Sequence, residues 1–543
     1  MFKKYGRFKS SLIPGLLISF FLLTLAVFLF FTLYENSNTN ESLFAVLSPR
    51  ILKLLKFTVF QATLSTIFSI LIGIVLAWSL SHQQKFPNRA LLVALFSSSL
   101  VLPTIIVVLG LITILGRNGW LNHISLNLFN HSFEGFLYGL SGILIAHVYL
   151  NGSYAARSLL HSFESIPKEK YKLAKSLGFS TCKRFYYIEW PAIKTTVFSV
   201  SSIVFLLCFT SFAIVLILGG NPSYNTLEVA IYEAVKLDFD ISFALELAFL
   251  QLSISVVLVF FTSSLKTDIS NIKTGSEMIP WSEPFGAKIV QKFTIFIFGL
   301  FFLLPLLAIV VDGVGADYMK ILSSSIFIKS FDTSIVIATL SSLITIFFTL
   351  LLSGAKRNFA LKSRLADSKL ASIFEILISF SGTLYLAIPS LVLGLGFFLL
   401  SQKFLAPQAF WATFALLSAN VLMSLPFSLS IIYPAMLKTA TRYDKLCFSL
   451  GIGGIKRFIY CEWPFLKESI GYVIALSFCL SLGDLGIISL FGSQDFSTLP
   501  WYLYGLMGSY KNSDASGVAL ILLSLVLGVF ILLPKVFSRS RVA

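Results

Sequence analysis

Two segments of this chain carry the same spacing of basic, acidic and proline residues. "KLAKSLGFSTCKRFYYIEWPAIK" runs from Lys172 to Lys194, and "KLCFSLGIGGIKRFIYCEWPFLK" runs from Lys445 to Lys467, 273 residues later without a gap. Thirteen of the 23 aligned positions are identical. An apolar stripe edged by lysines is typical of a surface that docks another protein. The alternative is an amphipathic helix lying on anionic lipid, but a matched second copy favours docking.

Each copy predicts two short helices joined at a glycine. Pro167 suits the first turn of a helix and Gly178 suits its end. The second copy begins instead with a capping-box pattern, Thr441-Arg-Tyr-Asp444. We call the resulting helix–Gly–helix structures the first elbow (161–194) and the second elbow (434–467).

The expected docking residues are matched between the two elbows. Each set comprises a lysine, three apolar or small residues on one helix face, the glycine and the closing proline. They are Lys172, Leu173, Ala174, Leu177, Gly178 and Pro191 in the first elbow, and Lys445, Leu446, Cys447, Leu450, Gly451 and Pro464 in the second.

One acidic residue lies inside an apolar run and is a candidate for contact with a cation. Asp484 stands in "SLGDLG", where the two glycines let a helix bend or a ligand approach closely. A carboxylate at membrane depth is costly and usually faces a cavity or a partner. Its counterpart 273 residues earlier is Ser211, so a substrate path through both positions would be asymmetric. The alternative is a hydrated carboxylate near the end of the run.

The elements that must position these residues are membrane-spanning helices. The chain is 56% hydrophobic and 12% charged, whereas a soluble domain is about a quarter charged. The apolar runs are unbroken and not alternating, which argues against a β-barrel. We therefore expect an all-α polytopic membrane protein with about twelve transmembrane helices. The runs lie near 11–33, 57–81, 90–115, 137–160, 195–218, 243–265, 289–311, 333–354, 372–400, 410–433, 468–491 and 518–534.

The net charge of +16 orients the protein and does not predict nucleic-acid binding. If the basic N-terminus is cytoplasmic, most Lys and Arg residues fall in cytoplasmic segments. Both termini are then expected in the cytoplasm. The run at 11–33 is too long for the apolar core of a signal peptide, so we interpret it as a retained first helix.

The repeat divides the chain into two halves of six helices. We expect a first half at 1–265, a cytoplasmic linker at 266–288 and a second half at 289–543. Because six helices separate equivalent points, both elbows fall on the same side and the repeats are parallel. A weaker echo, "GGNPSYNTLEVAIYEAV" at 219–235 and "FGSQDFSTLPWYLYGLM" at 491–507, supports the division.

At the elbows the chain resembles the permease subunit of binding-protein-dependent ABC importers. That family carries a cytoplasmic loop of pattern E-A-A-x3-G-x9-I-x-L-P. The spacing from each glycine to each closing Trp-Pro fits it, although Lys172 and Lys445 stand where the family has Glu. The resemblance implies the type I ABC importer permease fold, with each elbow a coupling helix seated on an ATP-hydrolysing subunit.

The resemblance also implies partners and a substrate. It implies a dimer of ATPase subunits that bind ATP and Mg, a periplasmic binding protein, and a multi-pass location in the bacterial inner membrane among its lipids. The stretches 219–240 and 481–510 are similar to fused permeases for thiamine, which implies transport of thiamine or its phosphates by alternating access. Fused ferric-iron permeases are the second resemblance. An ion-coupled secondary transporter is less well supported, because such proteins bury several ionisable residues.

The sequence carries no pattern for chemistry of its own. It has no Gly-Lys dipeptide and therefore no phosphate-binding loop of the G-x-x-x-x-G-K-[ST] type. Its five histidines form no H-E-x-x-H motif, and its five cysteines show neither metal-ligand spacing nor a disulfide framework. We expect no catalytic residue, no metal site and no cofactor bound by this chain.

Overall fold

The computed structural model describes residues 9–36, 48–130, 135–220, 223–263, 283–366, 368–403, 407–493 and 495–539. The regular secondary structure in these ranges is helical throughout. Within them, eleven helical stretches are long and apolar enough to cross a membrane. The all-helical polytopic architecture expected from the sequence is therefore confirmed.

The count differs from the expected twelve at one place. The run at 137–160 is not among the eleven stretches. It forms α6 (Leu140–His147), the π-helical segment η2 (Val148–Gly152) and α7 (Ser153–Glu164). Polar side chains lower the hydropathy of this stretch, and two of them, His147 and Asn151, are buried in the protein.

The chain forms two compact units, which we call unit I and unit II. Unit I comprises Phe44–Ala230 and Val257–Ala316, and unit II comprises the remainder. The units therefore cut the chain differently from the two halves of the sequence repeat. The helix that opens each half packs with helices of the other half.

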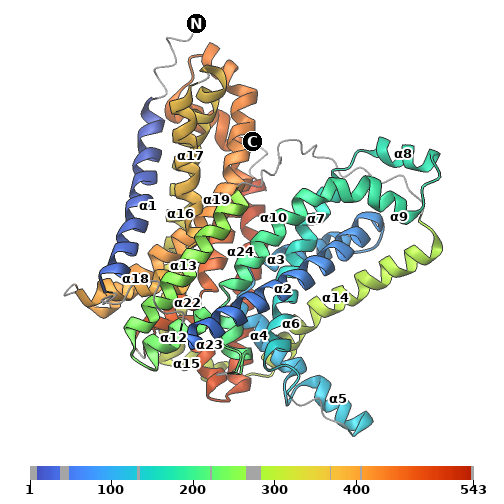
Figure 1. The fold of residues 1–543 in the computed structure, drawn as a ribbon, viewed down its shortest axis with the longest axis vertical. Coiled ribbons are helices and arrows are strands. Elements are labelled where there is room, and N and C mark those ends of the chain that lie inside the picture. The colour runs from blue at the N-terminus through green and yellow to red at the C-terminus, as the bar shows by residue number, and fades with distance from the viewer. Residues whose placement is uncertain are drawn as a thin grey trace. The chain divides into compact units, whose positions relative to one another are not determined.

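Unit I contains the first elbow and the helices that support it (Figure 1). The long helix α2 packs against α7, α10 and α14. Gly73 of α2 lies so close to α7 that an added Cβ would come within 2.6 Å of the Ala155 Cβ, a close approach that small residues permit in membranes. The helices are α2 (Pro49–His82), α3 (Arg89–Ser98), α4 (Thr104–Leu115), α5 (Trp120–Phe129), α6, η2, α7, α8 (Lys168–Ser176), α9 (Thr181–Arg184), η3 (Phe185–Glu189), α10 (Trp190–Phe209), α11 (Ala213–Leu218) and α14 (Phe285–Val314).

Unit II contains the second elbow. The opening helix α1 packs along α16, and α21 packs along α24. Most of α12 (Leu227–Lys236) and of α13 (Ile241–Ser263) also belongs to unit II, whereas the start of α12 up to Ala230 and the end of α13 from Val257 belong to unit I. The other helices are α1 (Lys9–Asn36), α15 (Tyr318–Ser323), α16 (Ser325–Ala366), α17 (Lys369–Thr383), η5 (Leu384–Leu386), α18 (Ser390–Lys403), α19 (Gln408–Ser449), α20 (Gly454–Arg457), η6 (Phe458–Glu462), α21 (Trp463–Leu482), α22 (Gly486–Phe491), α23 (Leu499–Gly508) and α24 (Asn512–Arg539).

An apolar core lies where α16, α19 and α21 meet beside the second elbow. It is formed by Ile346, Ile432, Met436, Leu466, Ile470 and Val473. Each of these residues is buried. The helix that leads into the elbow and the helix that leaves it are thus packed on a common core.

Four consecutive elements recur with all their bounds shifted by 273 residues. The elements α9, η3, α10 and α11 correspond in this way to α20, η6, α21 and α22. The correspondence includes the π-helical segment of each elbow and a break in the helix that follows it. The expected linker at 266–288 lies mostly outside the described residues, and α14 begins within its last part, at Phe285.

Candidate functional site

The first elbow turns at Gly178, as the sequence predicts. Helix α8 ends at Ser176, and Gly178 has a φ of +63°. The Phe179 amide donates to the Ala174 carbonyl at 3.0 Å, and the Gly178 amide donates to the Lys175 carbonyl at 3.2 Å. These two bonds form a Schellman motif, which requires the left-handed conformation that glycine adopts without penalty.

The second elbow turns in the same way at Gly451 but begins differently from the prediction. Gly451 has a φ of +65°, and the Ile452 amide donates to the Cys447 carbonyl at 2.9 Å. The predicted capping box at 441–444 is wrong, because α19 runs without interruption to Ser449. The amides there already have intrahelical partners. The Asp444 carboxylate is free to pair elsewhere and forms an ion pair with Arg457 at 2.6 Å.

The expected docking residues divide between the surface and the interior. Leu173 and Leu177 are 60% and 61% exposed, whereas Ala174 between them is buried. The second elbow repeats this division, with Leu446 and Leu450 exposed and Cys447 buried. The lysines, the turn glycines and the closing prolines of both elbows are exposed. The leucines thus form an outward apolar face, and the small residue of each triplet packs inward.

A charged cluster is buried behind the first elbow. The Arg184 side chain is fully buried, and its guanidinium forms ion pairs with Glu189 at 2.9 Å and with Glu283 at 2.7 Å. The His82 Nε2 atom, at the end of α2, lies 3.1 Å from Glu189 and 3.5 Å from Glu283. These contacts join four segments: α2, α9, η3 and Glu283, which lies two residues before the start of α14. Figure 1 shows α8 and α9 at the same end of unit I as the end of α2.

The second elbow has a corresponding cluster with different supporting residues. Arg457 donates to Glu462 at 3.0 Å, and these two residues match Arg184 and Glu189 at the 273-residue offset. Arg357 of α16 also pairs with Glu462, and Asp444 of α19 pairs with Arg457. All four side chains lie within unit II. Breaking such a buried pair leaves an uncompensated charge and costs about 3–5 kcal/mol.

A π-helical segment brings the arginine and glutamate of each elbow together. Glu189 lies five positions after Arg184, a spacing that puts two side chains on different faces of an α-helix of 3.6 residues per turn. The intervening η3 has the wider i→i+5 turn. The segment η6 does the same for the second elbow.

A buried tyrosine completes the first cluster. Tyr171 of α8 is fully buried, and its ring lies 6.4 Å from the His82 ring in an edge-on arrangement. Burial raises the pKa of the Tyr171 phenol well above its usual value, and the charge of Glu189 raises it further. The phenol therefore stays neutral. Its counterpart at the 273-residue offset is Asp444, which is the ion-pair partner of Arg457 in the second elbow.

The candidate acid Asp484 lies in a helix break and not in a continuous helix. The break separates α21 from α22, and the Asp484 Oδ1 atom accepts from the Gly486 amide at 3.2 Å. The Oδ2 atom is shielded from solvent and accepts no hydrogen bond from the described residues. Gly486 lies against α18, since a Cβ there would come within 2.6 Å of the Ser390 Oγ. Nearby, the Asn420 amide donates to the Ser481 hydroxyl at 2.9 Å.

The counterpart of this break contains Ser211. It separates α10 from α11, and Ser211 is buried. Two residues before the break, in the position that matches Ser481, the Cys208 Sγ accepts from the Asn151 amide at 3.2 Å. Both breaks are therefore flanked by buried amide side chains, but only the break of unit II carries a carboxylate.

The comparison with known proteins agrees with the elbow geometry. Residues 69–271 match the family described as "Binding-protein-dependent transport system inner membrane component". The chain is 34% identical to the thiamine transport system permease protein ThiP of Escherichia coli, over 97% of each protein. It is 36% identical to ThiP of Brucella abortus over 90% of this chain and 88% of that protein. It is 36% identical to ThiP of Haemophilus influenzae over 87% and 86%.

The chain belongs to the family of inner membrane components of binding-protein-dependent transport systems. It is a multi-pass permease, and the ATPase activity of such a system does not reside in this component.

Sequence reasoning missed several residues of the permease's outward apolar faces. Tyr186 and Tyr187 are exposed on η3, and Ile459 and Tyr460 are exposed at the matching positions of η6. The Tyr187 ring packs beside the Phe179 ring, and the ring centroids lie 5.9 Å apart. A tyrosine two residues before each Glu-Trp-Pro, Tyr187 and Tyr460, is the repeated signal that could have identified them.

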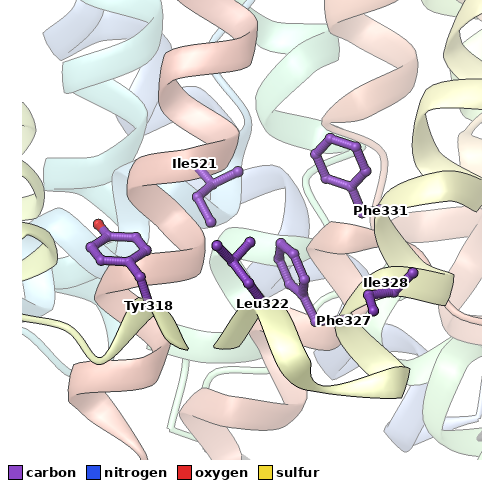
Figure 2. Close-up of a pocket in the computed structure, with 6 residues that line it drawn as sticks. All are labelled: Tyr318, Leu322, Phe327, Ile328, Phe331 and Ile521. Atoms are coloured by element: carbon purple, nitrogen blue, oxygen red, sulfur yellow. The ribbon is translucent and has the colours of Figure 1, made fainter. Parts of the chain in front are cut away.

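An apolar hollow of about 380 Å³ lies in unit II, away from Asp484 in sequence. Figure 2 shows its lining side chains, which come from α15, α16 and α24. They are Tyr318, Leu322, Phe327, Ile328, Phe331 and Ile521. The lining contains no carboxylate that would attract a cation, so we do not include this hollow in the substrate path.

Proposed function

We propose that this permease is the membrane component of an ABC importer for thiamine. The observation that carries the proposal is the similarity to proteins named as thiamine permeases over 97% of both chains. A match of this extent includes both elbows and both helix breaks. Thiamine or one of its phosphates is therefore the substrate that we infer.

We further propose that the chain consists of two parallel repeats of six helices, at 1–265 and 289–543. The shared 273-residue shift of α9–α11 and α20–α22 supports this division. In this arrangement the segment α6–η2–α7 also crosses the membrane. Together with the eleven stretches counted above it gives twelve crossings, and it is the fourth of them in chain order. Both termini then lie in the cytoplasm, with the basic N-terminal residues and both elbows.

The elbows are proposed to dock two ATPase subunits. Their outward leucines are exposed although they are apolar, which is typical of a surface that a partner covers. ATP and Mg would bind to those subunits, and a periplasmic binding protein would deliver the substrate. The buried charge clusters fix each elbow to the long helices, so movement of a docked subunit would be passed to the membrane helices. Alternating access requires that the elbows make different contacts in the two states.

The proposed substrate path includes Asp484 and Ser211. Thiamine carries a fixed positive charge, and the shielded Oδ2 atom of Asp484 accepts no hydrogen bond from the described residues. A cation passing the break between α21 and α22 would compensate this carboxylate, which is costly to bury alone. The break itself leaves the backbone able to adjust around a ligand.

Substrate identity is tested by uptake of labelled thiamine in cells with and without this chain, with ferric iron uptake measured in parallel. Loss of thiamine uptake alone is expected. Loss of iron uptake instead would keep the importer architecture and overturn the substrate. In the same assay, Asp484→Asn is expected to reduce thiamine uptake, while Asp495→Asn, which removes an exposed acid, leaves it unchanged. Equal uptake by both variants would remove Asp484 from the path.

Docking is tested by co-purification of the permease with its ATPase subunit. Leu446→Ser with Leu450→Ser is expected to abolish co-purification and leave the permease folded, because both side chains are exposed. Leu237→Ser is the matched control, since Leu237 is 63% exposed but lies outside the elbows. Retention of the ATPase by the double variant would contradict the docking surface.

A further inference from the structure

Two thiols face each other inside the second elbow. The Cys447 Sγ atom lies 3.1 Å from the Cys461 Sγ atom, although the residues are 14 positions apart. Both are free thiols; Cys447 is buried and Cys461 is partly exposed. An oxidant can therefore reach one sulfur while the other lies within contact distance.

The two sulfurs belong to the two arms of the elbow. Cys447 lies near the end of α19, before the turn at Gly451, and Cys461 lies in η6, after the turn. The ion pair between Asp444 and Arg457 joins the same two arms at 2.6 Å. The ion pair between the two arms therefore helps to keep the two thiols close together.

The fold does not require sulfur at these positions. In the first elbow the matching residues are Ala174 and Ile188, and the turn there has the same geometry. Two apolar side chains are therefore sufficient to pack this corner. The first elbow's own cysteine, Cys182, is exposed on α9 and has no second cysteine in that elbow.

We propose that Cys447 and Cys461 form a reversible disulfide that closes the second elbow under oxidation. Hydrogen peroxide is the oxidant in this proposal. The Cys461 sulfur attacks the O–O bond, which yields a sulfenic acid and one water. The Cys447 thiol then displaces the hydroxyl group as a second water, so that two thiols and one peroxide give one disulfide and two waters. The sulfurs need to approach by roughly 1 Å to reach the length of an S–S bond.

The consequence rests on the proposed role of the elbows in docking the ATPase. A covalent bond between the arms would prevent α19 and η6 from moving relative to each other. Only the second elbow has such a pair of cysteines, so oxidation would hold one of the two docking sites in a single conformation. The expected result is loss of substrate-stimulated ATP hydrolysis, with recovery after reduction by dithiothreitol.

The disulfide itself is tested by mass spectrometry of the whole transporter in membranes. The complex is treated with hydrogen peroxide, free thiols are alkylated, and the digest is compared with and without dithiothreitol. A peptide pair linked through Cys447 and Cys461 and released by dithiothreitol is expected. Oxidation of Cys182 with no linked pair would overturn the proposal. This readout does not depend on transport, so it stands even if the complex does not respond to thiamine.

The functional effect is tested with replacements taken from the first elbow. Cys447→Ala and Cys461→Ile are each expected to hydrolyse ATP at the same rate with and without peroxide, whereas Cys182→Ser is expected to lose hydrolysis in peroxide as the wild-type complex does. Loss in peroxide by the Cys447 and Cys461 variants would assign the effect to another site. A linked pair that leaves ATP hydrolysis unchanged would overturn the switch. Absence of thiamine-stimulated hydrolysis in the untreated complex would overturn the proposed substrate.

Discussion

The two elbows share an arginine–glutamate pair and differ in almost everything that supports it. Arg184 and Glu189 correspond to Arg457 and Glu462, and each pair is joined across a π-helical segment. The first pair is completed by a histidine and by an acid close to α14. The second is completed by another arginine and by an acid of the elbow's own helix.

The difference shows which part of the cluster the turn requires. The arginine–glutamate pair joins the two ends of the π-helical segment, and it is present in both copies. The other charges are needed to balance the pair in a buried place, and residues from different elements can supply them. The second cluster has two guanidinium groups for two carboxylates, whereas the first has one guanidinium group and His82.

Loss of the shared arginine is expected to give the largest difference in stability between the two elbows. Arg184→Met leaves Glu189 and Glu283 buried without a guanidinium group, at a cost of about 3–5 kcal/mol. Arg457→Met is expected to cost less, because Arg357 still pairs with Glu462. Thermal unfolding of the purified permease measures both. Lys183→Met, at an exposed neighbouring position, is the control, and equal losses for the two arginines would contradict the comparison.

Removal of one supporting acid gives a smaller and more informative effect. Asp444→Asn leaves two guanidinium groups with one carboxylate, at a cost of about 1–3 kcal/mol because a buried guanidinium group loses one of its partners. Glu283→Gln is expected to cost less, because it leaves one guanidinium group, that of Arg184, with one carboxylate, that of Glu189. The same unfolding measurement compares them. Equal losses would contradict the difference in charge balance between the two clusters.

Replacement of the turn glycines is expected to give the smallest difference in stability between the two elbows, because both elbows turn at a glycine with positive φ. Gly178→Ala and Gly451→Ala each place a side chain at positive φ, which costs roughly 1–2 kcal/mol. An added Cβ meets no neighbour at either position, so no clash adds to this cost. Gly453→Ala is the control, since Gly453 has a φ of −143° and equally open space. A clear difference between the two elbow variants, measured by thermal unfolding, would contradict the shared turn.

The sequence predicts the elbows well because their turns depend on local chemistry. Glycine at the left-handed position and proline at the closing helix have the same effect wherever they occur, so Gly178 and Gly451 could be placed from the repeat. The identical arginines and glutamates were equally visible. Their pairing was not, because a spacing of five residues indicates no contact in an α-helix, and the π-helical segments have no recognised sequence pattern.

Long-range partners could not be predicted from the repeat. Hydropathy indicates that the helices beginning at Lys9 and Phe285 cross the membrane, but it does not say which helices they pack against. The structure places α1 with α16 and α14 with α2 and α4. Likewise, nothing in the sequence joins Glu283 to Arg184, which lie 99 residues apart. The docking and substrate assignments remain predictions.

The position of Glu283 has a consequence for how the gene could be divided. A split of the coding sequence between residues 264 and 282 would place Arg184 on one polypeptide and one of its two carboxylates on the other. The second polypeptide would also carry α14, which packs in unit I. The fragments would then hold complementary charges at a shared site, so the fused chain differs from two autonomous permeases in tandem.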